Sequence, residues 1–472
     1  MVDMGEEHIG LQHVLFVSFP GQGHINPSLR FAKIIASKGA LVTFSTNEAT
    51  GEVMQKATSN TPGTPTPIGK GYLRFEFFSD GWDIGNTDLN AFMTNLKTAG
   101  PPAVRELICR QADEGRPVSC VVNNPFIPWV LDVAEELEIP SAVLWVQSCA
   151  VFSIYYHFCH FPEMFPASEE CWTGFSLKLP NMPRLRIQDL PSFMLHSTPY
   201  RSLTQVIYDQ IENISKASWI LVDSFEELEK PIMESIAQLS LPLKLLPVGP
   251  LFKFPSNSPT LLGDMWKATD CIDWLDSQPP ASVLYASFGS VVALGREQMV
   301  EVAHGIRDSR KPFLWVVRDT ARKDLPEGFE EETAGKGMVI PWSPQERVLS
   351  HPSVACFMTH CGWNSTTESL SSGVPVIAVP QWGDQTTNAK FLVEVYGVGV
   401  RLGEGEGGPL ITKAEVIQAI DEVISGLRSG EFRAAAVKWK DKAAASVGDG
   451  SSANNIQTFM EDIKRGARSV PS

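Results

Sequence analysis

Residues 342–385 of the chain read WSPQERVLSHPSVACFMTHCGWNSTTESLSSGVPVIAVPQWGDQ. The apolar run 354–358 predicts a buried strand, 364–372 predicts a short helix, and 376–379 predicts a second strand. The turn at 360–365 therefore joins a strand to the first turn of a helix. Free backbone N–H groups and the helix dipole favour an anion at such a place.

Three polar side chains share one face of the predicted helix. Asn364, Ser365 and Glu368 follow an i, i+1, i+4 spacing. A phosphate group at the turn would leave the Glu368 carboxylate within reach of a ribose diol. Without this context a glutamate on a helix surface would simply be solvated. We interpret the stretch as a site for a nucleotide sugar.

The composition is that of a globular protein, and it limits the kinds of partner. The chain has 472 residues, enough for two domains, with 43% hydrophobic and 20% charged residues and a net charge of −15. That charge argues against nucleic acid or an anionic membrane as the main partner. No apolar run reaches the roughly 18 residues that a membrane span requires. The eight cysteines are scattered and the N-terminus has no apolar signal core, so we expect reduced thiols, no metal site and a cytoplasmic protein.

Both halves of the chain alternate strand and helix patterns. This alternation predicts an α/β fold with two parallel sheets, each covered by helices on both faces. Open α/β sheets bind ligands at the carboxyl ends of their strands, so we expect the site in a cleft between two facing halves. Strands are expected at 13–19, 41–45, 118–122, 141–146, 282–288, 313–317 and 338–340. Helices are expected at 27–38, 129–136, 226–239, 296–307, 413–427, 432–445 and 454–465.

The stretch quoted above resembles the signature box of plant secondary-product glycosyltransferases, the family-1 inverting enzymes that use UDP-sugars. The resemblance is carried by Trp342, Pro344, Gln345, His351, the run 360–365, Glu368, the run 373–375, Pro380, Asp384 and Gln385. It extends over nearly the whole chain and implies the GT-B architecture, in which two Rossmann-like doubly wound domains face a cleft. The implied division is an acceptor-binding domain at 1–250, a linker at 251–264, a UDP-sugar-binding domain at 265–455, and a helix at 456–472 that returns to the first domain.

The resemblance also implies roles for the polar residues of the box. Trp342 would stack on uracil, since an indole suits a flat base. Glu368 would hold the ribose, and Asp384 and Gln385 would bind sugar hydroxyls. Gln at the last position implies glucose, because His there often accompanies galactose. The implied UDP-sugar site consists of Ser290, Trp342, Ser343, Gln345, His360, Trp363, Asn364, Ser365, Glu368, Asp384 and Gln385. UDP-glucose is then a co-substrate, and no cofactor or metal is expected.

The loop 21–26, which reads GQGHIN, mimics the G-x-G-x-x-G motif of dinucleotide-binding folds. However, Asn26 replaces the third glycine and His24 stands where a phosphate should approach, which argues against an NAD-dependent oxidoreductase. The resemblance instead implies that His24 is the catalytic base, and an imidazole with a pKa of about 6.5 suits that role. The usual aspartate partner is replaced by Asn124, which supplies no charge to strengthen the base. A carboxylic acid acceptor, with a pKa of about 4, would need no strong base.

Four further stretches, 75–83, 123–129, 144–150 and 380–385, resemble the branch of the family that esterifies hydroxycinnamic, hydroxybenzoic and indole acids with glucose. The expected function is therefore formation of a 1-O-glucose ester of a phenolic acid by a monomeric enzyme. Two alternatives stay open: O- or C-glucosylation of a flavonoid or phenol, and a UDP-sugar sensor without turnover. The pocket for the small aromatic acceptor is expected to include Trp82, Phe92, Phe126, Ser148, Phe152 and Met194.

Overall fold

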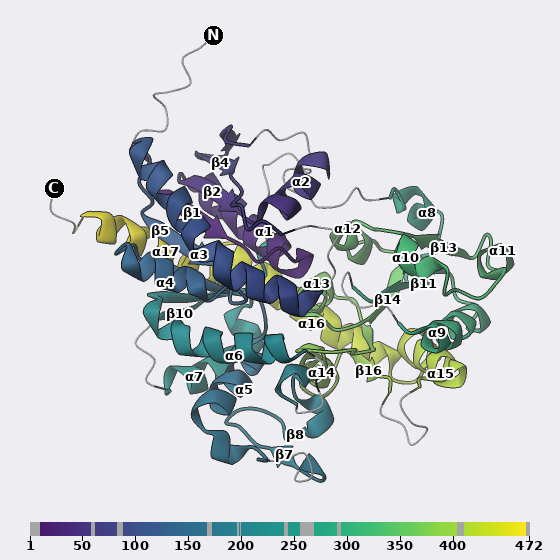
Figure 1. Cartoon of the computed structure of the whole chain (residues 1–472). Helices are drawn as coiled ribbons and strands as arrows, with labels where there is room; N and C mark the ends of the chain where they lie inside the picture. The colour runs from purple at the N-terminus through teal and green to yellow at the C-terminus, as the bar shows by residue number, and fades with distance from the viewer. Residues whose placement is uncertain are drawn as a thin grey trace. The chain divides into compact units, whose positions relative to one another are not determined.

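The computed structural model describes residues 10–57, 62–82, 88–167, 172–195, 198, 200–239, 244–254, 269–289, 294–403 and 410–468. The chain divides into two compact units (Figure 1). The N-terminal unit comprises residues 1–169, 193–266 and 446–472, and the C-terminal unit comprises residues 170–192 and 267–445.

The N-terminal unit is built on an eight-stranded sheet with the order β10-β9-β6-β5-β1-β2-β4-β3. Its neighbouring strands are parallel except for the antiparallel pair β3 and β4. The strands are β1 (His13–Val17), β2 (Leu41–Ser45), β3 (Thr66–Ile68), β4 (Gly71–Phe75), β5 (Cys120–Asn123), β6 (Ser141–Trp145), β9 (Trp219–Val222) and β10 (Lys244–Pro247). The order places β1, the first strand, between β5 and β2, which is the arrangement of a doubly wound sheet.

Helices cover both faces of this sheet, because alternate strand residues point to opposite sides. On β1, Val14 and Phe16 join a buried cluster with α1 and α17, whereas Leu15 and Val17 join another with α3 and α4. The helices are α1 (Gln22–Ser37), α2 (Glu48–Ala57), α3 (Leu89–Asp113), α4 (Trp129–Glu136), α5 (Cys149–His160), α6 (Arg201–Asn213), α7 (Glu226–Ala237) and α17 (Ser451–Arg468).

The junction between β1 and α1 differs from the expected strand 13–19 and helix 27–38. β1 ends at Val17, and α1 begins at Gln22, ahead of Pro27. The reason is local, since the backbone N–H groups of residues 24 and 25 both donate to the carbonyl of Gly21 at 2.9 Å and close the first turn before the proline. His24 therefore lies in the first turn of a helix.

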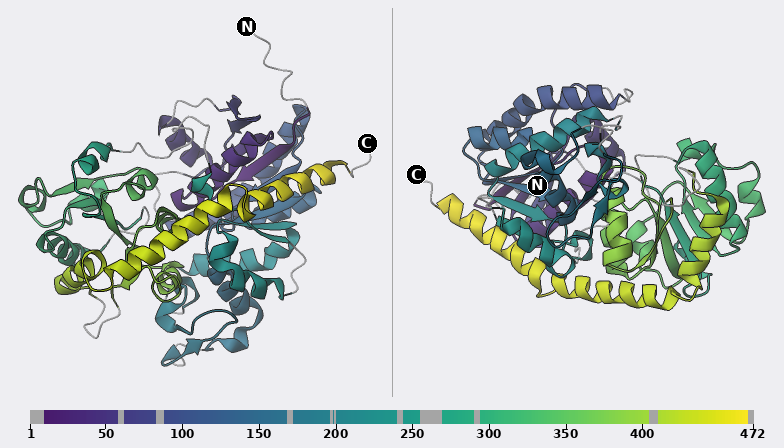
Figure 2. Two further views of the ribbon diagram at one scale, coloured as in Figure 1. Left: turned by 180° about the vertical axis from the view of Figure 1, so that it is seen from behind. Right: turned by 90° about the horizontal axis from the view of Figure 1, so that it is seen from below.

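The last helix, α17, packs on the N-terminal unit although it comes from the end of the chain (Figure 2). The Asn455 amide donates to the Pro247 carbonyl at 2.9 Å, and the Trp219 indole N–H donates to Asp462 at 3.3 Å. Phe459 is fully buried beside the Trp219 ring, with the ring centroids 5.3 Å apart. None of the described helices combines the length and apolarity that a membrane span requires.

The C-terminal unit is built on a six-stranded parallel sheet with the order β13-β12-β11-β14-β15-β16. The strands are β11 (Val283–Ser287), β12 (Phe313–Val316), β13 (Gly337–Ile340), β14 (Val354–Thr359), β15 (Val376–Ala378) and β16 (Gly399–Arg401). The helices are α8 (Ile272–Asp276), α9 (Arg296–Asp308), α10 (Asp319–Arg322), α11 (Phe329–Glu332), α12 (Gln345–Leu349), α13 (Trp363–Ser372), α14 (Gln385–Lys390), α15 (Lys413–Ile424) and α16 (Ser429–Val447).

Residues 170–192 belong to the C-terminal unit, whereas the sequence places them inside a domain at 1–250. The buried Asp189 carboxylate explains this, because it lies 2.9 Å from Arg401 Nη1 and 3.5 Å from Lys390 Nζ. The Asp189 carbonyl also accepts a hydrogen bond from the Thr387 hydroxyl at 2.7 Å. At the other end of the chain the division falls at 445/446 rather than 455/456. Most of the expected linker 251–264 lies outside the described residues.

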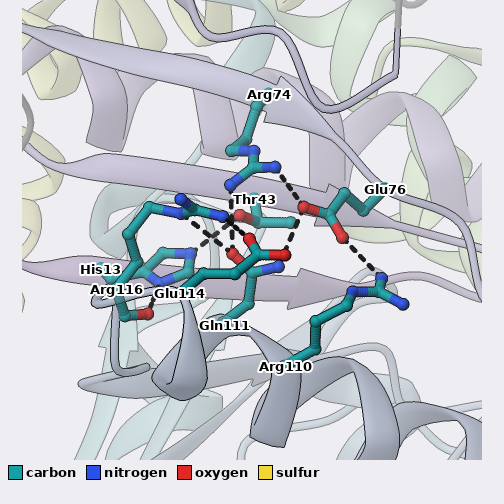
Figure 3. A network of polar contacts seen from close by, with 8 residues as sticks. All are labelled: His13, Thr43, Arg74, Glu76, Arg110, Gln111, Glu114 and Arg116. Atoms are coloured by element: carbon teal, nitrogen blue, oxygen red, sulfur yellow. Dashed lines mark hydrogen bonds and ion pairs between the residues drawn. The ribbon is translucent and has the colours of Figure 1, made fainter. Parts of the chain in front are cut away.

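A buried polar network joins the N-terminal sheet to α3 (Figure 3). Gln111 donates to Glu76 at 2.9 Å and accepts from Arg74 at 3.1 Å, and Arg74 is itself paired with Glu76. At its edge His13 Nδ1 lies 2.7 Å from the Arg116 carbonyl, which can only accept, so Nδ1 carries the proton. His13 Nε2 then accepts from the Thr43 hydroxyl at 2.8 Å. Neutral His13 is thus fully hydrogen-bonded.

Replacing Asp189 by Ala should strongly destabilise the C-terminal unit. It would leave the cations of Arg401 and Lys390 without their buried counter-charge, a change that typically costs about 3–5 kcal/mol. Urea unfolding followed by tryptophan fluorescence measures the effect. The matched control is Glu226→Gln, which breaks the exposed Lys230–Glu226 pair and should change stability little. Equal effects of the two substitutions would contradict the anchoring role of Asp189.

The stability of the N-terminal unit should fall as the pH drops below about 6.5. Burial lowers the pKa of His13 to about 4, so the unfolded chain takes up a proton on this side chain that the folded chain excludes. Between pH 7 and pH 5, His13→Gln should lose about 2 kcal/mol less than the wild type in its free energy of unfolding. Denaturant titrations at the two pH values check this, and parallel losses in both proteins would contradict it.

Candidate active site

The expected UDP-sugar residues that the structure describes lie at the carboxyl ends of strands in the C-terminal unit. Trp342 and Ser343 follow β13, His360 follows β14, and Asp384 lies between β15 and α14. Parallel strands end at one edge of a sheet, which is where open α/β sheets hold ligands. Ser290 lies outside the described residues.

Gln345 connects the polar residues of this edge through both ends of its amide. Its nitrogen donates to the Ser365 hydroxyl at 2.9 Å and to the Glu368 carboxylate at 2.7 Å. Its oxygen accepts from the Tyr285 hydroxyl at 3.0 Å, and that hydroxyl also lies 2.8 Å from Ser343 Oγ. Because Ser365 and Glu368 are buried, this network holds them in place rather than leaving them solvated.

Tyr285 is a member of this network that the sequence did not suggest. It lies within the apolar run that forms β11, where an aromatic side chain indicates core packing. Its ring is fully buried and stacks on Phe357, while burial raises the pKa of its phenol well above the ordinary value. The phenol therefore stays protonated and acts as the donor to Gln345.

His360 occupies a space that two glycines leave open. A side-chain Cβ on Gly289 or on Gly362 would come within 2.6 Å of His360 Nε2. Gly289 also has a φ of +83°, a backbone conformation that glycine adopts without strain. Burial lowers the pKa of His360 to about 4, so at neutral pH it is an uncharged imidazole that can donate one hydrogen bond.

The helix α13 begins directly after this histidine. Its N-cap is Gly362, which provides no side-chain hydrogen bond, so no cap occupies the first N–H groups of the helix. Asn364 lies half-buried in the first turn. Trp363 is 4% exposed, so this residue is packed inside the unit.

Asp384 and Gln385 stand at the start of α14, but both are partly engaged. Asp384 Oδ2 accepts from the Asn388 amide at 2.7 Å. Gln385 is buried, and its oxygen accepts from the backbone N–H groups of Gln381 at 2.9 Å and Trp382 at 3.2 Å. The Gln385 amide is thereby oriented so that its NH₂ group is the part that remains for a ligand.

In the N-terminal unit, His24 and Asn124 follow the neighbouring parallel strands β1 and β5. Val17 pairs with Asn123 in the sheet, and the Asn124 N–H donates to the Val17 carbonyl at 3.1 Å. Asn124 is fully buried. Burial lowers the pKa of His24 to about 4, partly offset by the Asn124 side chain. No other group among the described residues shifts this pKa.

Aromatic rings surround His24. The Phe126 and Phe19 ring centroids lie 4.4 Å and 5.0 Å from the imidazole, and Phe92 contacts both Phe19 and Trp82 at 6.0 Å and 5.2 Å. Trp82, Phe92 and Phe126 were expected in the acceptor pocket. Phe19 was not, although an aromatic residue directly after β1 and before the glycine turn is a usable signal.

The three other expected acceptor residues, Ser148, Phe152 and Met194, have contacts or positions of their own. Ser148 is the N-cap of α5, where its hydroxyl accepts from the Val151 N–H at 3.1 Å. Phe152 is 1% exposed and packs edge-on against Trp145. Met194 is buried within the short helix Ser192–Met194. The structure thus gives Ser148 and Phe152 structural contacts of their own.

Among the described residues, no three His, Cys, Asp or Glu side chains are grouped to hold a metal ion.

Comparison with known proteins identifies the family. Residues 207–431 match the family model described as UDP-glucoronosyl and UDP-glucosyl transferase. A gallate 1-beta-glucosyltransferase from Punica granatum is 49% identical over 99% of this chain and 92% of its own length. A limonoid UDP-glucosyltransferase from Citrus unshiu is 49% identical over 98% of this chain and 91% of its own length.

A solved structure shares the fold as well. The crystal structure of Os79 from O. sativa in complex with UDP matches with a TM-score of 0.84 and 30% identity, covering 95% of this chain and 100% of that one. Two doubly wound units, the polar edge of the C-terminal sheet and near-complete coverage at high identity lead to the same conclusion. The chain belongs to the plant family-1 UDP-glycosyltransferases and has their GT-B fold.

Proposed function

We propose that the protein transfers glucose from UDP-glucose to the carboxylate of a small phenolic acid and so forms a 1-O-glucose ester. The observation that carries this proposal is the setting of His24, which lies half-buried among aromatic rings beside a neutral amide. With a pKa lowered to about 4 by burial, this imidazole is a weak base. A carboxylic acid is already ionised at neutral pH and needs no base. Similarity to the gallate 1-beta-glucosyltransferase supports the same acceptor class.

On this proposal the C-terminal unit binds the donor. The half-buried Trp342 stacks on uracil, Glu368 holds the ribose diol, and Asp384 and Gln385 contact glucose. His360 and the first N–H groups of α13 face the diphosphate. The acceptor oxygen attacks the anomeric carbon as the bond to UDP breaks, and these donors stabilise the negative charge that grows on the departing diphosphate.

The remaining expectations are part of the same proposal. The acceptor pocket contains Trp82, Phe92 and Phe126 around His24, and the enzyme works as a cytoplasmic monomer with UDP-glucose as its co-substrate. No bound cofactor is required for the attack just described. The limonoid UDP-glucosyltransferase among the relatives shows that similarity alone does not fix the acceptor, so a direct assay is needed.

Gallate and methyl gallate provide a matched test, because they share their phenolic hydroxyls and differ in the free carboxylate. Gallate should give a product that releases glucose on mild alkaline hydrolysis, while methyl gallate should be a poor acceptor. Ester formation should also persist down to about pH 5, since the nucleophile stays ionised above its pKa of about 4. If methyl gallate and a flavonoid were turned over as fast as gallate and gave alkali-stable products, O- or C-glucosylation would replace the ester proposal.

Glu368→Ala should chiefly raise the KM for UDP-glucose. A charge-assisted hydrogen bond contributes about 1.5–3 kcal/mol, which corresponds to roughly a 10- to 100-fold rise. Initial rates at saturating acceptor measure the effect, and Glu331→Ala on the exposed surface of the same unit is the control. An unchanged KM for UDP-glucose would remove Glu368 from the donor site.

Gln385→His should lower glucosyl transfer and alter the choice of sugar. The substitution removes the amide oxygen that accepts from the Gln381 and Trp382 backbone, and with it the orientation of the NH₂ group. Losing a matched partner to a sugar hydroxyl can cost several kcal/mol in discrimination. Competition between UDP-glucose and UDP-galactose measures the change, and an unaltered preference at unaltered turnover would contradict the assignment.

A further inference from the structure

The side-chain amide of Asn124 has a defined orientation. Its oxygen accepts a hydrogen bond from the Phe126 backbone N–H at 3.1 Å. Turning the amide over would place its NH₂ group against that N–H and set two donors face to face. The Asn124 nitrogen is therefore the atom left over, and it is buried with no hydrogen-bond partner among the described residues.

His24 has a complementary unsatisfied atom. Its Nδ1 is also buried and has no hydrogen-bond partner among the described residues, and the imidazole lies 4.4 Å, centroid to centroid, from the ring of Phe126, whose backbone N–H holds the Asn124 oxygen. The residue as a whole is half-buried, and of its two ring nitrogens only Nδ1 is both buried and without a hydrogen-bond partner among the described residues. Nδ1 is therefore the ring nitrogen on the protein side, which leaves Nε2 as the nitrogen for an acceptor.

Two pairings of these atoms are possible, and they imply opposite tautomers. If Nδ1–H donated to the Asn124 oxygen as a second bond, the Asn124 nitrogen would stay buried and unsatisfied, at a cost of about 1–3 kcal/mol. If the Asn124 nitrogen donates to a bare Nδ1, both buried atoms are satisfied by one bond. In an uncharged imidazole, an acceptor at Nδ1 requires the proton at Nε2.

We propose that Asn124 is a positioning residue that holds neutral His24 in its Nε2–H tautomer, so that His24 acts as a hydrogen-bond donor to an acceptor that is already an anion. This inference rests on the proposed function and deepens it. Nε2–H donates to one oxygen of the acceptor carboxylate. A carboxylate oxygen forms the bond to the anomeric carbon, the bond from that carbon to the UDP oxygen breaks, and its electron pair leaves with UDP. No proton changes place.

The same geometry discriminates against a neutral phenol. A phenol must lose its proton as it attacks, and in this tautomer Nε2 has no lone pair to receive it. An aspartate at position 124 could only accept, so it would draw the proton to Nδ1 and free the Nε2 lone pair. The choice of amide or carboxylate at this position thereby selects between ionised and neutral acceptors. A neutral imidazole that donates to a substrate oxygen is an established catalytic arrangement.

Nitrogen NMR of protein labelled in its histidine rings tests the tautomer directly, with the His24 signals identified by their loss in His24→Gln. In the wild type at pH 7.5, Nε2 should resonate as the protonated type and Nδ1 as the unprotonated type. In Asn124→Asp the two assignments should exchange. Protonated Nδ1 in the wild type would overturn the inference, and this spectrum decides the point even if Asn124→Asp does not fold.

Kinetics on gallate and on a simple phenol supply the second readout. His24→Gln keeps an amide donor, so it should retain ester formation within about tenfold of the wild type, whereas His24→Ala should lose more. Asn124→Asp should raise transfer to the phenol relative to gallate on the order of 10²-fold, the usual contribution of a general base. Equal loss of ester formation in His24→Gln and His24→Ala would overturn the donor role. Failure of the wild type to use any carboxylate would instead refute the proposed function, whatever tautomer the spectrum shows.

Discussion

The parallel pairing of β1 with β5 is the constraint on which the proposed acceptor site of the N-terminal unit depends. It aligns Val17 with Asn123, so the loops that follow the two strands leave the sheet at the same edge. His24 and Asn124 become neighbours for this reason, although they are far apart in the sequence. The order of strands also sends the helices after β1 and β5 to opposite faces of the sheet, which opens the crevice that doubly wound folds use for ligands.

The carboxyl edges of the two sheets differ in chemical character: one is polar and the other is aromatic. The C-terminal edge is a connected set of hydrogen bonds centred on Gln345, and it ends in an uncapped helix that favours negative charge. The N-terminal edge is aromatic. Among the described residues, no charged group shifts the pKa of His24. Such a division suits a reaction in which charge builds on the donor while the nucleophile only has to be held, because donors fixed in advance need no reorganisation as the charge develops.

Much of the fold could be predicted from the sequence, because strand and helix periods are local properties. The strand at 41–45 and the helix at 129–136 have the predicted bounds, and most others differ by a few residues. The long helix α3 was not predicted, because the run Gly100-Pro101-Pro102 in its interior indicates a break. It persists because tertiary packing outweighs propensity: Gly100 lies so close to the Trp129 ring that a Cβ would come within 2.4 Å.

The proposed UDP-sugar residues could be named from the sequence because nearly all of them lie in one stretch, 342–385, that resembles a known pattern. The partners that orient them could not, since Tyr285 lies in a strand that looks like core and Phe19 lies in a separate turn. The attachment of residues 170–192 to the C-terminal unit was equally hidden, because it depends on Asp189 meeting cations from β16 and α14.

That attachment has a consequence for recombining this enzyme with its relatives. A chimaera joined near residue 250 would take residues 170–192 from one parent and Lys390, Thr387 and Arg401 from the other. The buried Asp189 would then face side chains that did not evolve with it. Crossovers that carry residues 170–192 together with the C-terminal half keep this set of contacts from one parent, so specificity can be exchanged without mixing the buried ion pairs.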